Sequence, residues 1–85
     1  MIIWFQRSAG GRRVFRNTTG LYFKTHGVYP TVHEQLPKFI TELGYKCEPA
    51  TAYFIQPVGG EDVHVENKGL DIEDEDVLPF MIRFG

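Results

Sequence analysis

The sequence has few of the residues that build covalent cross-links or membrane spans. Its single cysteine, Cys47, cannot form a disulfide within the chain, which fits a reducing compartment. No apolar run approaches the roughly 20 residues that a membrane-spanning helix needs. The apolar opening at residues 1–5 is too short for the core of a secretion signal. We therefore expect a soluble, cytoplasmic protein that makes no contact with a membrane.

Catalytic and metal-binding motifs are also missing. The histidines at positions 26, 33 and 64 have neither a helical i, i+4 spacing nor a neighbouring cysteine pair, so a zinc site would need distant segments to meet. Cys47 has Lys46 beside it, but neighbours on a strand point to opposite faces. A buried, inert thiol is therefore favoured over a nucleophile. We expect no enzymatic activity, no metal and no cofactor.

The composition is sufficient for one folded domain that spans residues 1–85. Apolar residues make up 42% of the chain and aromatic residues 14%, which argues against disorder. A chain of this length buries roughly 60–65% of its unfolded surface, so its stability should be modest. The expected class is α+β, with an antiparallel or mixed sheet of about five to six short strands and one main helix packed on one face.

Alternating apolar residues and turn sequences predict the strands. Glycine-containing turns at 8–11, 17–20 and 58–62 are expected to separate them. The first strand is apolar on both faces, which is typical of a central strand. The expected strands cover residues 1–7, 12–16, 21–26, 51–57, 63–66 and 77–85.

One helix is expected over about residues 32–43. Thr31 and Glu34 have the spacing of a capping box, in which each side chain accepts from the other's backbone amide. Gly44 is suited to end the helix in a left-handed conformation. Pro37 lies past the expected first turn and predicts either a kink or a later start. A single apolar stripe is formed by Val32, Leu36, Phe39, Ile40 and Leu43.

The C-terminal segment joins an acidic run to an apolar one. Residues 67–76 are expected to form a polar loop, and Pro79 indicates that the strand after it begins there or lies at an edge. The acidic run lacks the glycine and the closing glutamate of a calcium-binding loop, so it does not predict a calcium site. The alternating pattern predicts that four side chains of the last strand point into the core: Leu78, Phe80, Ile82 and Phe84.

Charge is divided unevenly along the chain. Residues 1–46 carry seven basic and two acidic side chains, a net charge of +5, whereas residues 47–85 carry two basic and nine acidic, a net charge of −7. Such asymmetry bears on partners more than on fold. The acidic half could neutralise the basic half within the folded domain or could dock on a basic partner.

Two sets of charged residues are therefore candidate binding sites. The favoured set would contact a basic surface of a protein partner and contains Glu61, Asp62, Glu66, Asp71, Glu73, Asp74, Glu75 and Asp76. The alternative set would contact nucleic acid through an arginine-rich hairpin and contains Arg7, Arg12, Arg13 and Arg16. Binding of nucleic acid is the less favoured of the two, because the pI of about 5.8 lies well below the basic range usual for such proteins.

A small, acidic domain with one cysteine and no catalytic motif resembles the inhibitors that phages direct against host machinery, including anti-CRISPR-type proteins. The resemblance implies a viral protein that acts in the host cytoplasm on a nucleic-acid-handling partner. We expect a non-enzymatic protein-binding module of this kind. A self-associating assembly subunit is the remaining alternative, because charge asymmetry and an exposed edge strand both favour association between copies.

Overall fold

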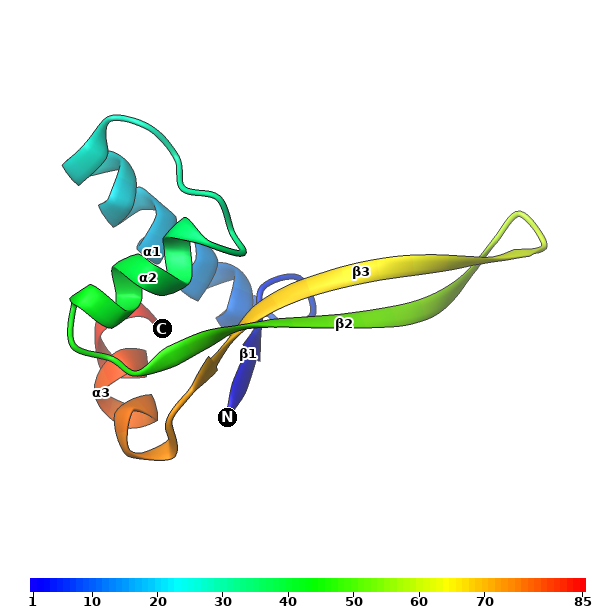
Figure 1. Cartoon of the computed structure of the whole chain (residues 1–85). Helices are drawn as coiled ribbons and strands as arrows, with labels where there is room; N and C mark the ends of the chain where they lie inside the picture. Colours follow the sequence, from blue (N-terminus) through cyan, green and yellow to red (C-terminus); the bar gives the residue numbers. More distant parts are fainter.

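The computed structural model describes every residue of the chain, 1–85, as a helical body from which a long β-hairpin extends (Figure 1). The molecule measures 44 × 30 × 20 Å. The elements in chain order are β1 (Ile2–Trp4), α1 (Ala9–His26), α2 (Gln35–Glu42), β2 (Cys47–Val58), β3 (Glu61–Ile72) and α3 (Asp74–Phe84). The α+β class is confirmed, but three strands and three helices replace the expected five to six strands and one main helix. None of the helices is long and apolar enough to cross a membrane.

The sheet is antiparallel and has the order β1-β3-β2. The expected strands at 51–57 and 63–66 are present in longer form, and Gly59 and Gly60 make the turn between them with φ of 59° and 84°. Positive φ at both positions suits a two-residue hairpin turn, which glycine adopts without strain. The first strand lies at an edge and not in the centre. It pairs with β3 alone, and the central place goes to β3, which pairs with both other strands.

A single helix, α1, replaces the two strands expected at 12–16 and 21–26. The Ser8 side chain accepts from the Gly11 amide at 3.0 Å and caps the start. Gly27, with φ of 76°, ends the helix. The buried residues recur with helical spacing and are Gly11, Val14, Thr18, Thr19 and Tyr22. The turns expected at 8–11 and 17–20 are therefore wrong as well, because the glycines of both segments lie within α1.

The expected helix at 32–43 corresponds to α2. Its start differs from a capping box by one residue: Thr31 Oγ1 accepts from the Gln35 amide at 3.0 Å, and Gln35 Oε1 accepts from the Thr31 amide at 2.8 Å. Pro37 is the third helical residue, where an amide would have no partner within the helix, so the proline is accommodated. The expected end is confirmed: the Gly44 amide donates to Thr41 and the Tyr45 amide to Ile40, as in a Schellman motif.

The C-terminal segment forms a helix, α3, and not a strand. Phe80 and Phe84 are buried, four residues apart, while Leu78 and Ile82 are 70% and 78% exposed. The predicted inward face is therefore wrong for two of its four members. The polar loop expected at 67–76 is also wrong, because β3 runs to Ile72 and α3 begins at Asp74. Carboxylates in a first helical turn interact favourably with the helix dipole, which explains why the acidic run begins this helix.

The core lies between one face of the sheet and the three helices. Ile3 and Leu70 are paired across β1 and β3, so their side chains share that face. Fully or nearly buried residues from every helix complete the cluster, whose members are Ile3, Phe5, Val14, Tyr22, Leu36, Phe39, Ile40, Leu70, Ile72, Phe80 and Phe84. All of these lie at the body end of the sheet. The outer half of the β2–β3 hairpin, residues 51–66, has no helix against it, and we refer to it as the arm (Figure 1).

Candidate functional site

The acidic run is built into the junction between β3 and α3. Asp71 lies in β3, Glu73 precedes the helix, and the other three carboxylates fill the first turn of α3. Three of the five have structural partners: Asp76 accepts from the Lys46 amide at 2.9 Å, and Asp74 accepts from the amino group of Met1 at 3.2 Å. Asp71 adds a longer contact to the same amino group, at 3.5 Å. Glu73 and Glu75 are the members whose side chains make no such contact.

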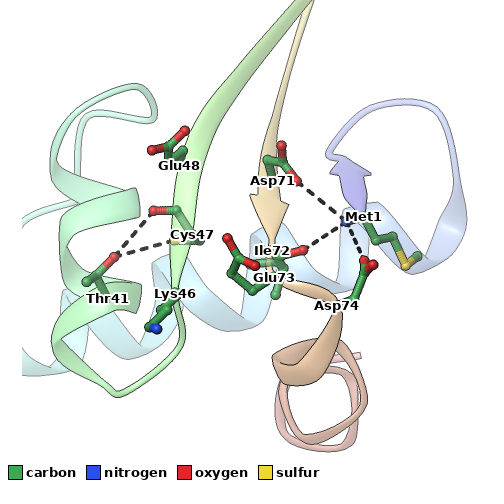
Figure 2. Close-up of a pocket in the computed structure, with 9 residues that line it drawn as sticks. All are labelled: Met1, Thr41, Lys46, Cys47, Glu48, Asp71, Ile72, Glu73 and Asp74. Atoms are coloured by element: carbon green, nitrogen blue, oxygen red, sulfur yellow. Dashed lines mark hydrogen bonds and ion pairs between the residues drawn. The ribbon is translucent and has the colours of Figure 1, made fainter.

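The Met1 amino group lies in a ring of acceptors, as Figure 2 shows. It also donates to the Ile72 carbonyl at 2.8 Å. The hydrogen bond to Asp74 raises the pKa of this amino group above its ordinary value of 8.0, and the charges of Asp74 and Asp71 act in the same direction. Because the folded-state pKa is raised, the contribution to stability is complete below pH 8.0 and is lost as the pH rises through the folded-state pKa.

Replacing Asp74 by asparagine should therefore lower the pKa of the Met1 amino group toward 8.0. Glu75→Gln is the matched control, because Glu75 is one residue further along α3 and does not contact the amino group. The change in pKa is measured by NMR titration of the amino group or from the pH dependence of its acylation rate. An equal shift in both variants would mean that general charge, and not the Asp74 contact, raises the pKa.

An open hollow of about 510 Å³ lies beside this ring and is bounded by strands β2 and β3 and by α2 (Figure 2). Cys47 is half-buried at its wall, and its thiol donates to the Pro37 carbonyl at 3.3 Å. Burial raises the pKa of the Cys47 thiol, which holds it protonated at neutral pH. No three His, Cys, Asp or Glu side chains converge there or elsewhere as a ligand group for a metal.

The structure divides the predicted acidic set into two groups. Glu61 and Asp62 lie at the tip of the arm, next to the Gly-Gly turn, whereas Asp71 lies at the body end of the same strand. Nine residues of extended chain separate Asp62 from Asp71, which corresponds to about 30 Å. Glu66 lies between the two groups and pairs with Lys68 at 3.5 Å. One compact acidic patch is therefore not formed.

The arm exposes apolar side chains that the sequence-based prediction did not include. Tyr53 is 68% exposed and Ile55 is 64% exposed, and Val58 and Val63 are also exposed. From residue 47 to residue 67 the chain contains no lysine or arginine. The signal that could have identified this surface is the run from residue 49 to residue 60, which contains no charged residue although it forms an outer strand and its turn.

The arginines of the alternative set do not share one hairpin. Arg7 lies in the loop after β1, with its guanidinium carbon 3.7 Å from the centre of the Phe54 ring, which is a cation–π contact at the base of the arm. Arg12, Arg13 and Arg16 lie on one exposed side of α1, since positions three and four apart are neighbours on a helix. The three ion pairs in the chain involve Met1 and Lys68 but no arginine. The acidic residues therefore do not neutralise these arginines by direct pairing.

Neither a family model, nor a curated protein, nor a solved structure matches the chain. The candidate binding surfaces are therefore identified from the structure alone. They are the arm, the acidic junction at α3, and the arginine side of α1. The arm is the most unusual of the three, because its apolar side chains lie outside the core.

Proposed function

We propose that the chain is a non-enzymatic protein-binding module that docks on a basic surface of a nucleic-acid-handling partner. The observation that carries the proposal is the arm, which presents exposed apolar side chains among acidic ones and contains no lysine or arginine. A two-stranded hairpin alone in water is marginally stable, so contact with a partner would stabilise it. Exposed apolar side chains next to polar ones are typical of protein-binding surfaces.

The acidic residues of the arm require that the partner's surface be basic. Glu61 and Asp62 at the tip would approach a basic groove first, and Glu73 and Glu75 at the α3 junction offer a second negative site. Complementary charge increases association rates and selects among partners more than it adds affinity. A groove that ordinarily holds nucleic acid is basic and so complements these carboxylates. Occupying the groove would inhibit the partner protein. This is the mode of a phage-type, anti-CRISPR-like inhibitor acting in the cytoplasm.

The test compares two variants that keep the structural contacts intact. We expect Glu61→Gln with Asp62→Asn to weaken capture of a basic partner from nuclease-treated lysate and to reduce the salt dependence of that capture. The matched control is Glu42→Gln, an exposed carboxylate on α2. If the tip variant and the control capture the same proteins with the same salt dependence, the acidic arm is not the docking surface.

A nucleic-acid contact through α1 is the second candidate, favoured by one observation: Arg12, Arg13 and Arg16 are exposed together and have no acidic partner. It requires a mobility shift with duplex DNA or single-stranded RNA that falls steeply as salt increases. Our first proposal expects no shift at about 50 mM salt. A shift that disappears when the three arginines are replaced by glutamine would favour the second candidate instead.

A further inference from the structure

The outer edge of β2 has backbone groups without partners in the chain. The hydrogen bonds from the Phe5 amide to Lys68 and from the Ile72 amide to Met1 show that even-numbered residues of β3 face β1. Odd-numbered residues of β3 therefore bond β2, and the register places them opposite even-numbered residues of β2. It follows that the odd-numbered residues of β2 direct their amides and carbonyls outward.

Prolines limit this open edge to a short window. Pro49 and Pro57 are both odd-numbered, so each has no amide to present at the outer edge and takes no bond away from β3. Between them, outward amides belong to Thr51, Tyr53 and Ile55, and no loop or side chain accepts from them. At the body end the edge is covered, because the Cys47 carbonyl accepts from Thr41 of α2 at 3.5 Å.

We propose that two copies of the chain pair antiparallel along this edge, with Tyr53 opposite Tyr53 of the second copy. Pro49 and Pro57 are each four residues from Tyr53, so this register places proline opposite proline at both ends. Thr51 then lies opposite Ile55 of the second copy, and all three outward amides of each copy find an acceptor. The window is symmetric about Tyr53, which is the property that a two-fold interface requires.

The chemistry of the window favours a second copy over a basic peptide. Residues 49–60 carry no charge, so two acidic molecules can meet there without placing like charges opposite each other. Tyr53 and Ile55 share one side of the strand and are exposed, so the pairing brings the two tyrosines together and a β-branched residue beside each. The outer edge of β3 is a poorer candidate, because its outward positions in the arm include Asp62 and Glu66, which discourage edge pairing.

Pairing along β2 leaves the proposed acidic docking residues free. Glu61, Asp62 and Glu66 all lie in the part of β3 beyond its pairing with β1, so in the arm β3 stays the outer strand when two copies pair along β2. The dimer would carry two acidic tips pointing in opposite directions. Both proposals draw on the exposed arm, but the tests are separate, because Tyr53→Pro changes β2 and Glu61→Gln with Asp62→Asn changes the tip of β3.

The first test uses prolines placed where they remove only outward amides. We expect wild type to show a concentration-dependent dimer in sedimentation velocity and Tyr53→Pro to be monomeric. His64→Pro is the matched control, since His64 is paired with Ile55 and also directs its amide outward, but from β3. It should dimerise as wild type does. A wild-type chain that stays monomeric up to about 1 mM, or a dimer lost only in His64→Pro, would overturn the proposal.

The second test reports the register. In a Cys47→Ser background, Tyr53→Cys places the two new thiols opposite each other, and mild oxidation should produce a covalent dimer. Ile55→Cys is the control, because its two thiols would be offset by four residues, or about 13 Å, beyond the reach of a disulfide. Cross-linking at position 55 and not at 53, or equally at both, would contradict the proposed register.

Discussion

Replacing Gly11 by alanine is expected to destabilise the fold by about 3 kcal/mol, the upper part of the usual range for overpacking. A Cβ atom at Gly11 would overlap the carbonyl oxygen of Trp4 and lie 2.9 Å from its carbonyl carbon. Both groups belong to backbone, so no side-chain rotation can relieve the overlap. Gly11 is where α1 packs against the end of β1, and the variant must separate the helix from the sheet or distort the Ser8 cap.

Gly20→Ala is the matched control in the same helix. A Cβ at Gly20 meets no atom within 4 Å, so the substitution should stabilise the protein by about 0.5–1 kcal/mol through helix propensity. Urea unfolding followed by circular dichroism gives both changes in the free energy of unfolding. If the two variants move the midpoint in the same direction, the close approach of α1 to Trp4 is wrong.

Phe80→Ala should cost about 3–5 kcal/mol, the range for removing a buried aromatic ring. Phe80 is fully buried and its ring packs at centroid distances of 5.1 Å from Phe84 and 5.4 Å from Tyr45. Small domains have total stabilities at the low end of roughly 5–15 kcal/mol, so this variant should be largely unfolded under mild denaturant.

Ile82→Ala is the control for Phe80→Ala and also tests the helical assignment of α3. Ile82 is 78% exposed, so its truncation should change stability by no more than about 0.5 kcal/mol. In a strand, Phe80 and Ile82 would share one face and both truncations would be costly. A large loss of stability in Ile82→Ala would therefore restore the strand interpretation of this segment.

The two largest errors of prediction from sequence have a common physical cause. A short apolar run fits more than one period: Leu78, Phe80, Ile82 and Phe84 alternate as in a strand, while Val77, Phe80, Met81 and Phe84 follow helical spacing. The helical set packs against the core, and the acidic turn before it favours a helix start. In α1, glycine, threonine and aromatic residues lowered the apparent helix propensity, although Gly11, Val14, Thr18 and Tyr22 are helically spaced.

Local chemistry was sufficient where an element is specified by residues close in sequence. The Gly59–Gly60 turn, the end of α2 at Gly44 and the strands on either side of the turn could be read from the sequence, because glycines there take positive φ and the flanking patterns are unambiguous. The charge asymmetry and the presence of two charged candidate surfaces are likewise properties of the sequence alone.

The tertiary structure determined which residues of those surfaces are exposed and which are already paired within the chain. Only packing shows that Met1 meets Asp71 and Asp74 across some 70 residues of chain, which takes part of the acidic run out of use for docking. Only the sheet register shows that β2 is an open edge and that Tyr53 and Ile55 lie outside the core. The physical reason is that exposure and pairing depend on contacts between distant segments, whereas the sequence by itself determines composition, charge and local backbone preference.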